Sequence, residues 1–536
     1  RCSTIEIGER QIGLQLRFEQ SSARPFLSDS TRLWAIEHDF MDSSSNALYQ
    51  GLHAFLCAPR ERRDLLLFSR EPQVDSSLRL NINHGDFNAL ALKVKQARDI
   101  FLIIGPPGTG KTSFGLVTTL KEQLSEPHSS VLLLSYTNRA VDEMSSKLVE
   151  HNIDFMRIGP ELACAPEYRH FLIKEKISES QNVSQVREKI KSTRVFAATI
   201  ASLNGAINLL KLKKFDLVII DEASQIPEPH LLAVLSAKTD DDKPAVGKIV
   251  MIGDHKQLPA VVQQSAQEAE VHEPELLSIG LPDCRISLFE RFVNRYGDNT
   301  DTTYMLTRQG RMHCDIAVFP NDEFYCGKLD IAGLPHQCRE LPEVKTVSTI
   351  EKALWEHRVS FVNVVEKYYV GAPDKINNAE ASLVRDIVAE IWQHESALSQ
   401  TFSIVDSVGI IVPYRNQISN IRNMLVKAGI PGADDVAIDT VERFQGSQRD
   451  YIIYSFTVKR PGQLRFLTQH TFTDADGSTV DRKLNVAMTR AREHLVLVGD
   501  ARLLCGASVF AKLVRYCKAS GAFYNVDEQL PRPSGH

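Results

Sequence analysis

The stretch RDIFLIIGPPGTGKTSF, which begins at Arg98, constrains the fold of this chain more than any other. A run of apolar residues over 100–104 leads into a glycine-rich turn, and the residues after the turn continue as a helix. A buried strand, a glycine loop and a helix in this order form the context that a phosphate-binding loop requires. The stretch therefore predicts a parallel α/β sheet with a phosphate site at one strand end.

The loop itself contains the residue types that bind a nucleotide phosphate. Glycines let successive backbone N–H groups turn inward at a helix N-terminus, and Lys111 adds a positive charge for the β and γ phosphates. The hydroxyl of Thr112 is placed to ligate Mg²⁺, so ATP and Mg²⁺ are the expected cofactors. The residues expected to contact the nucleotide here are Gly105, Pro106, Pro107, Gly108, Thr109, Gly110, Lys111 and Thr112.

Two series of short apolar runs, each ending in polar residues, indicate two parallel α/β domains. The first series comprises SVLLLSYTN, RVFAATI, FDLVIIDEAS and KIVMIGDHKQL, and the second comprises SVGIIVPYRNQ, DVAIDTVERFQG, RDYIIYSF and HLVLVGD. We place these domains at residues 81–280 and 281–520, with a C-terminal tail over 521–536. Alternating polar and apolar residues before residue 80 predict a small β-rich accessory domain over 1–80. A charge-rich stretch over about 160–192 predicts a helical insertion into the first domain.

Acidic and amide side chains follow two strands of the first domain. Asp221 and Glu222 stand side by side after Leu217 to Ile220, so their side chains point in different directions. Asp221 is predicted to hold the metal ion, and Glu222 to polarise the attacking water. Gln257, in MIGDHKQLPAV, is predicted to hydrogen-bond the γ-phosphate or the water.

Arg490, in the stretch RKLNVAMTRAREHLVLVGD of the second domain, is the candidate for an arginine supplied from across a cleft. Hydrolysis of a phosphoanhydride accumulates charge that a phosphate loop cannot fully neutralise, and a guanidinium stays charged and bridges two oxygens. Arg311, in QGRMH, is a second candidate. The catalytic residues predicted from sequence are Lys111, Glu222, Gln257, Arg311 and Arg490.

Composition limits the remaining possibilities. The formal charge of −5 argues against a protein that coats nucleic acid through global positive charge, so a nucleic-acid site would need a local basic groove. No apolar run approaches the roughly 18 residues of a spanning helix. The nine cysteines contain no C-x-x-C pair, which is typical of reduced thiols. A monomer in the cytoplasm or nucleus, without membrane contact, is expected.

The order of these motifs resembles that of the superfamily 1 helicases that act in nonsense-mediated mRNA decay and of their DNA-acting relatives. The resemblance runs from about residue 81 to 500 and rests on GPPGTGKT, DEASQ, GDHKQLP, SLFERF, QGRMHCDIAVFPNDEFYCGKL, NNAEA, VGIIVPYRNQ, TVERFQG and LNVAMTRAR. It implies two RecA-like domains with ATP between them, single-stranded DNA or RNA across both, and 5′→3′ movement. Regulatory protein partners are also expected.

By the same resemblance, Asn88 and Gln448 are expected near the base and ribose of the nucleotide, and Glu380 is expected to contact the nucleotide. Three positions depart from the family pattern: Asn88 replaces a Gln, Gly310 replaces a Tyr that stacks on the base, and Gln448 replaces a Glu. All three fall on the base and ribose side, whereas the phosphate side is intact. The hypothesis is that ATP hydrolysis is retained while selectivity for the base is relaxed.

Nucleic-acid contacts are assigned by resemblance to two strand ends. Backbone amides and hydroxyls at such ends track the phosphates, and a few basic and aromatic side chains add charge and stacking. The residues nominated are Ser135, Thr137, Asn138, Arg139, Pro413, Tyr414, Arg415 and Thr440.

The resulting prediction is an ATP-dependent translocase or helicase on single-stranded nucleic acid. The alternatives are a nucleic-acid-stimulated NTPase that remodels protein–nucleic acid complexes without unwinding duplexes, and a binding scaffold with a vestigial nucleotide site. The intact phosphate-side residues argue against the scaffold.

Overall fold

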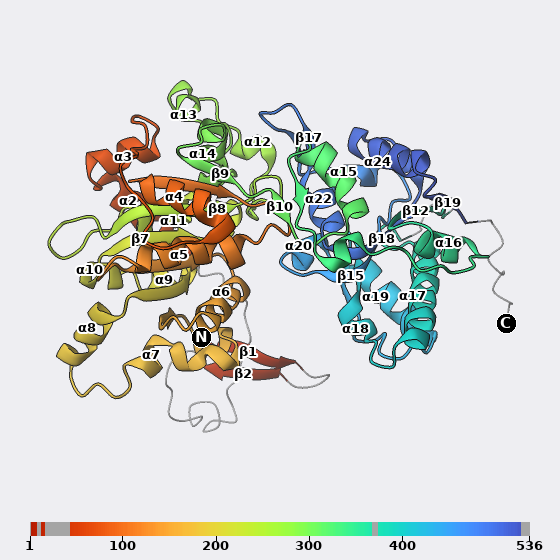
Figure 1. Ribbon diagram of the computed structural model, residues 1–536, viewed down its shortest axis with the longest axis horizontal. Helices are drawn as coiled ribbons and strands as arrows, with labels where there is room; N and C mark the ends of the chain where they lie inside the picture. The colour runs from red at the N-terminus through yellow and green to blue at the C-terminus, as the bar shows by residue number, and fades with distance from the viewer. Residues whose placement is uncertain (1, 8–11, 17–42, 367–372, 527–536) are drawn as a thin grey trace, which may run out of the picture.

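The computed structural model describes residues 2–7, 12–16, 43–366 and 373–526, which form two α/β domains side by side (Figure 1). One domain is built on a seven-stranded sheet and the other on a six-stranded sheet. Every hydrogen-bonded strand pair within these two sheets is parallel. The predicted fold class, with two RecA-like domains, is confirmed.

The first sheet has the order β5-β6-β4-β7-β8-β3-β9. Its strands are β3 (Ile100–Ile104), β4 (Val131–Ser135), β5 (Met156–Ile158), β6 (Val195–Thr199), β7 (Phe215–Ile220), β8 (Val246–Gly253) and β9 (Thr303–Met305). Successive residues of β4 pack on opposite faces: Leu132 and Leu134 join one core cluster, and Leu133 joins the other. Both faces are therefore buried under helices, which explains the continuous apolar runs.

Helices cover both faces of this sheet and extend below one edge of it (Figure 1). They are α4 (Asn88–Gln96), α5 (Val117–Leu124), α6 (Asn138–Glu150), α9 (Ile200–Gly205), α10 (Leu209–Leu212), α11 (Glu228–Leu235), α12 (Ala266–Ala269), α13 (Pro274–Ser278) and α14 (Leu288–Tyr296). Between β5 and β6 lie η3 (Glu161–Ala163), η4 (Pro166–Phe171), α7 (Ile173–Lys176) and α8 (Val183–Ser192), over the stretch predicted as a helical insertion.

The second sheet has the order β14-β13-β15-β18-β12-β19. Its strands are β12 (Val359–Asn363), β13 (Val408–Ile411), β14 (Ala437–Asp439), β15 (Arg449–Ser455), β18 (Ala491–Gly499) and β19 (Phe523–Asn525). The main helices of this domain are α15 (Cys314–Phe324), α16 (Thr349–Trp355), α17 (Asn378–Leu398), α18 (Ile404–Ser407), α19 (Arg415–Lys427), α20 (Val441–Phe444), α21 (Leu464–Leu467), α22 (Arg482–Met488), α23 (Ala501–Leu504) and α24 (Ser508–Ala519). A separate antiparallel hairpin, β16 (Thr471–Thr473) and β17 (Thr479–Asp481), projects from this domain.

Three predicted boundaries differ from the structure. Residues 1–80 contain one described hairpin, β1 (Cys2–Ile7) with β2 (Ile12–Leu16), but α2 (Ser43–Leu56) and α3 (Arg60–Leu66) are helices, so the described residues of this region hold more helix than strand. The helix α3 packs on the first domain, where Arg291 donates to the Leu66 carbonyl at 2.7 Å. The first domain extends past residue 280, because β9 joins its sheet beside β3. The predicted tail over 521–536 includes β19, an edge strand of the second sheet.

In the part of the chain that the structure describes, we find no helix that is both long and apolar enough to cross a membrane.

Candidate active site

The phosphate loop lies between β3 and a π-helix over Lys111–Leu116 that leads into α5. Gly108 and Gly110 both have a φ of 76°, in the left-handed region where a side chain is strained. A Cβ at Gly108 would also lie 2.6 Å from the Cβ of Arg311, so only glycine lets the arginine approach the loop this closely. The glycines of the loop therefore stand at the positions where the backbone conformation requires them.

The acidic pair meets the phosphate loop at the end of β7. Thr112 Oγ1 donates to Asp221 Oδ2 at 2.8 Å, and Lys111 Nζ lies 3.7 Å from Glu222 Oε1. Burial, and then the neighbouring charge of Glu222, raise the pKa of Asp221 to about 6. A hydroxyl paired with a desolvated carboxylate is a donor set that suits Mg²⁺, which prefers oxygen ligands.

Glu222 has a φ of 53°, in the left-handed region that non-glycine residues seldom occupy. This turn follows the end of β7 and directs the Glu222 side chain toward the phosphate cavity, whereas Asp221 pairs with Thr112. Strained backbone of this kind is enriched at active sites because the surroundings hold it in place for a task. The two adjacent acids therefore face different partners, as the sequence predicted.

Gln257 and Arg490 meet across the two domains. Arg490 Nη2 donates to Gln257 Oε1 at 3.1 Å, and Arg490 Nε donates to the Val486 carbonyl at 3.0 Å. Arg490 is 2% exposed, and burial followed by repulsion from Arg311 lowers its pKa to about 9. The guanidinium consequently stays charged at neutral pH, with one edge turned toward the first domain.

Arg311 is a second arginine beside the phosphate loop, and it is half-buried. Its Nε donates to Gln448 Oε1 at 2.9 Å, and its Nη1 donates to the Thr489 carbonyl at 3.2 Å. Burial lowers the pKa of Arg311 to about 10, so it too is charged at neutral pH. The backbone N–H of Gly310 donates to the Gly108 carbonyl at 2.9 Å, which ties this segment to the phosphate loop.

These side chains surround one cavity of about 330 Å³. From the first domain it is lined by Pro106, Pro107, Gly108, Gly110, Lys111, Thr112, Glu222 and Gln257, and from the segment that leads into the second domain and from that domain by Arg311, Gly446 and Arg490. The predicted phosphate-side residues are thus brought together. Glu143 of α6 also lines the cavity, and burial raises the pKa of its carboxyl. Glu143 carried no functional signal in the sequence, because it lies in an ordinary amphipathic helix.

Two residues predicted to contact the nucleotide are engaged elsewhere. The Asn88 amide donates to Asn83 Oδ1 at 2.8 Å and accepts from the His84 backbone N–H at 2.7 Å. Glu380 is buried within the second domain and does not line the cavity. Its carboxyl oxygens accept hydrogen bonds from Asn377, Ser455 and Thr457 at 2.6–2.8 Å. Its proximity to the nucleotide, expected by resemblance, is therefore not supported by the geometry.

The environment of Glu380 predicts how the stability of the folded protein depends on pH. Burial raises the pKa of Glu380 to about 8 from an ordinary value of 4.5. Because the folded-state pKa lies above the unfolded one, the linked stability is complete below about pH 4.5 and is lost as the pH rises through about 8. We expect the melting temperature of the wild type to fall more steeply between about pH 5 and about pH 8 than that of Glu380→Gln. The control is Glu390→Gln on the same helix, and parallel profiles for all three proteins would contradict the prediction.

The nominated nucleic-acid residues lie at the carboxyl ends of β4 and β13 and at the start of α20, on both domains. Thr137 caps α6 by accepting from the Ala140 backbone N–H at 3.2 Å, and the Tyr414 ring stacks on Phe466 with centroids 5.0 Å apart. Asn138, Arg139 and Arg415 are exposed, and Thr440 is half-buried, whereas Ser135 and Pro413 are buried. Ser135 has a hydroxyl without a partner among the described residues. The exposed residues of this set are accessible to a nucleic-acid strand. The buried Ser135 side chain would become accessible only if the residues around it moved.

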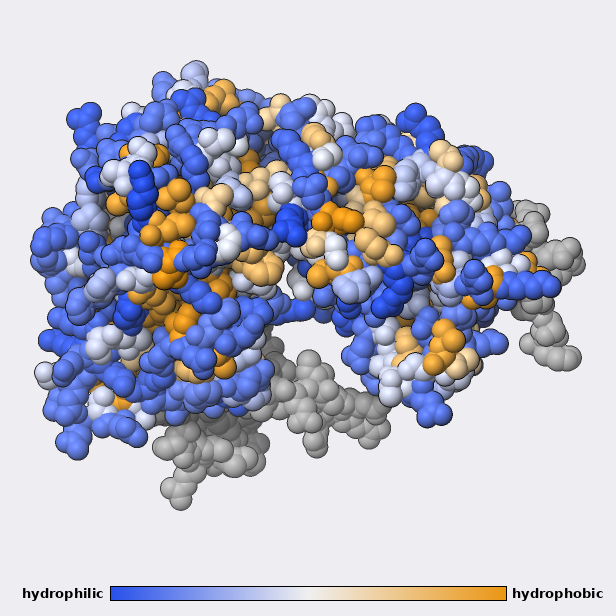
Figure 2. Space-filling model, viewed as in Figure 1, coloured by the Kyte–Doolittle hydropathy of each residue, from blue (hydrophilic) through white to orange (hydrophobic). Residues whose placement is uncertain are grey.

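A second cavity of about 570 Å³ opens beside Thr137, between the two domains. Its lining includes Thr137 and the apolar segment 258–262 of the first domain, with Gln445 and His470 of the second. Val261 in this segment is 77% exposed. Figure 2 shows the surface hollowed between the two domains. The segment 258–262 carried no functional signal in the sequence, because short apolar runs after a strand are common in loops and in the hydrophobic core.

Two family models, each described as an AAA domain, match residues 88–263 and 284–502. The chain is 30% identical over 524 residues to the DNA replication ATP-dependent helicase/nuclease JHS1 of Arabidopsis thaliana, covering 93% of this chain and 35% of that protein. It is 29% identical to the DNA replication ATP-dependent helicase/nuclease DNA2 of Bos taurus, covering 86% of this chain and 42% of that protein. The chain therefore spans less than half the length of these relatives.

A relative of more similar length is the DNA polymerase alpha-associated DNA helicase A of Schizosaccharomyces pombe. It is 27% identical over 465 residues, covering 77% of this chain and 63% of that protein. Among solved structures, Arterivirus nonstructural protein 10 (helicase) with DNA aligns over 76% of this chain and 61% of that chain, at 14% identity and a TM-score of 0.37.

Proposed function

Because the chain belongs to the superfamily 1 helicases, we propose that it hydrolyses ATP between its two α/β domains and uses the cycle to move along single-stranded DNA. The observation that carries this proposal is the hydrogen bond between Gln257 and Arg490 beside the phosphate loop. These two residues lie 233 positions apart in the chain. DNA is chosen as the track because the relatives named above are DNA replication and DNA polymerase-associated helicases. The same names support an intracellular, nuclear setting.

The proposed chemistry divides among residues on the two sides of the cavity. Lys111 and the loop N–H groups bind the phosphates, and Glu222 orients and polarises a water molecule for attack on the γ-phosphorus. Arg311 and Arg490 neutralise the charge that develops on the phosphoryl oxygens. Thr112 and Asp221 would hold Mg²⁺, which would supply further charge to the phosphates.

Movement would follow from the position of the two arginines. Arg311 and Arg490 belong to the segment that leads into the second domain and to that domain, whereas the phosphate loop belongs to the first. Binding of a γ-phosphate draws the arginines to it and closes the domains, and hydrolysis releases them. Nominated strand contacts lie on both domains, so each cycle would shift one set of contacts relative to the other. A 5′→3′ direction is proposed from family resemblance.

The proposal is tested by the steady-state ATPase rate without nucleic acid, with single-stranded DNA and with single-stranded RNA of matched sequence. Glu222→Gln is the blank. Stimulation by DNA, absent in the blank, is the expected result, and stimulation by RNA alone would change the track. A rate indifferent to both polymers would overturn translocation. A strand-displacement assay then separates a helicase from an NTPase that remodels complexes without unwinding.

Relaxed selectivity for the base is the second property that we propose. The Asn88 amide is held by Asn83 and His84, and Gly310 has no ring to stack on a base. A site that rejects an analogue strongly does so through polar groups that the analogue leaves unpaired. We expect kcat/KM values for ATP and GTP within about tenfold of each other, measured at equal Mg²⁺ concentration. A hundredfold preference for ATP would contradict this expectation.

A further inference from the structure

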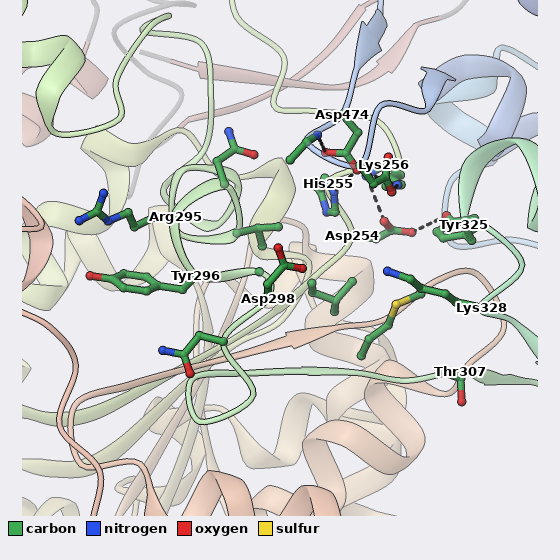
Figure 3. Close-up of a pocket in the computed structure, with 18 of the residues that line it drawn as sticks. Asp254, His255, Lys256, Arg295, Tyr296, Asp298, Thr307, Tyr325, Lys328 and Asp474 are labelled. Atoms are coloured by element: carbon green, nitrogen blue, oxygen red, sulfur yellow. Dashed lines mark hydrogen bonds and ion pairs between the residues drawn. The ribbon is translucent and has the colours of Figure 1, made fainter.

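Tyr325 forms a contact between the two domains that sequence analysis did not assign. It follows α15 in the second domain, is 2% exposed, and its hydroxyl donates to Asp254 Oδ2 of the first domain at 2.8 Å (Figure 3). Burial, and then the charge of Asp254, raise the pKa of Tyr325 well above its usual value, so the hydroxyl stays protonated and can donate. A buried hydrogen bond to a charged group is among the stronger contacts that a neutral side chain makes.

Asp254 also accepts a hydrogen bond from Gln257, so it links Tyr325 to Gln257. Gln257 Nε2 donates to Asp254 Oδ2 at 2.7 Å, and Gln257 Oε1 accepts from Arg490 at 3.1 Å. A carboxylate can only accept, and a guanidinium can only donate. The Gln257 amide is therefore held in a single orientation, with its nitrogen toward Asp254 and its oxygen toward Arg490.

The hydroxyl of Tyr325 is itself held in place by Asn485. Asn485 Nδ2 donates to Tyr325 Oη at 2.8 Å and also to the Lys256 carbonyl at 2.8 Å. Asn485 lies on α22, five positions before Arg490. Tyr325, Asn485 and Arg490 of the second domain thus hydrogen-bond to loop 254–257 of the first. Each of these hydrogen bonds joins a donor to an acceptor.

This network forms a wall between two cavities. Gln257 and Arg490 line the phosphate cavity, whereas Asp254 and Tyr325 line a separate cavity of about 1010 Å³ (Figure 3). Beside them, Lys256 contacts Asp474 at 2.6 Å and Asp476 at 2.7 Å, both on the loop of the β16–β17 hairpin. The second domain therefore reaches loop 254–257 both from the hairpin and from Tyr325.

We propose that Tyr325 is a positioning residue for hydrolysis: its hydroxyl orients Asp254, and through Asp254 it sets the Gln257 amide beside the γ-phosphate position when the domains are together. The proposal rests on the proposed function, because it deepens the role of the same site. Tyr325 does not line the phosphate cavity, so its effect on the nucleotide is proposed to pass through Asp254 to Gln257.

The test is Tyr325→Phe, which keeps the ring and removes only the hydroxyl. We expect kcat for ATP to fall about tenfold, because Asp254 loses a donor and the Asn485 amide loses an acceptor. The dissociation constant of a fluorescent ATP analogue should stay within about twofold, since no phosphate contact is removed. Tyr516→Phe, in the same domain, is the matched control and should leave both values unchanged.

A double-mutant cycle separates positioning from a general effect on structure. In a Gln257→Ala background, Tyr325→Phe should lower kcat by less than about twofold, because the group that it positions is already absent. A second tenfold loss in that background, an unchanged kcat for Tyr325→Phe alone, or a loss confined to nucleotide affinity would each overturn the proposal.

The same measurements distinguish this proposal from the proposed function. If the wild type hydrolyses ATP but does not respond to nucleic acid, translocation fails, while the cycle still decides the role of Tyr325 on the basal rate. A wild type that hydrolyses no ATP would overturn both.

Discussion

Replacing Glu222 by Gln is expected to lower ATP turnover by at least about a hundredfold, the size of effect associated with loss of a general base. The Glu222 carboxylate lies 3.7 Å from Lys111 Nζ and faces the phosphate cavity, where an attacking water would sit. Glutamine keeps the shape but cannot accept a proton. Nucleotide affinity should change only a few-fold, because the phosphate loop is untouched.

The measurement pairs steady-state turnover with binding of a fluorescent ATP analogue. Glu188→Gln on α8, an exposed position far from the phosphate loop in sequence and in the fold, is the matched control and should retain full activity. A Glu222→Gln protein that keeps more than about a tenth of the wild-type rate would mean that another group polarises the water. Glu143, whose carboxyl lines the same cavity, would then be the next residue to test.

Replacing Arg490 by Ala is expected to lower ATP turnover by about a thousandfold or more, as for arginines supplied across a cleft in other phosphate-loop enzymes. Arg490 bonds the Val486 carbonyl through Nε and Gln257 through Nη2, so its fork is oriented before the nucleotide arrives. Lysine keeps the charge but cannot make both contacts at once, and Arg490→Lys should recover only a small part of the activity.

Arg492→Ala provides the control for this prediction. Arg492 lies two residues further along, pairs with Asp450 at 2.9 Å and does not line the cavity. Its replacement should leave turnover within about twofold, as expected for a half-exposed ion pair. Because Arg490 is buried, melting temperatures must accompany the kinetics. A folded Arg490→Ala protein with near-normal turnover would remove this residue from the proposed chemistry.

The phosphate loop and the acidic pair could be predicted because each lies within one short segment. A buried strand, a glycine turn and a helix follow one another directly over residues 100–124, and Asp221 and Glu222 end a single strand. Parallel strands place their carboxyl ends at one edge of a sheet, so the strand pattern predicts that Thr112 and Asp221 lie at the same edge, and the structure pairs them at 2.8 Å. The catalytic roles of these residues remain predictions for the experiments above.

Two residues that were assigned to the nucleotide by resemblance, Glu380 and Asn88, are bonded to other protein groups in the structure. Glu380 was expected near the nucleotide, but three hydrogen-bond donors within its own domain hold its carboxylate. Asn88 was expected at the base, yet its amide closes a local loop with Asn83 and His84. A motif position carries over only when its neighbours leave the side chain free, and one sequence does not show which partners a polar group has found.

Sequence alone predicted the strand–loop–helix core of both domains and the residues that gather around the phosphate cavity, since local periodicity and glycine spacing encode them. Tertiary structure alone decided which distant segments meet: Arg490 with Gln257, Tyr325 with Asp254, and the β16–β17 hairpin with Lys256. It also assigned β9 to the first sheet and β19 to the second. These contacts join residues far apart in the chain, and their energy depends on burial and geometry that exist only after the two domains pack together.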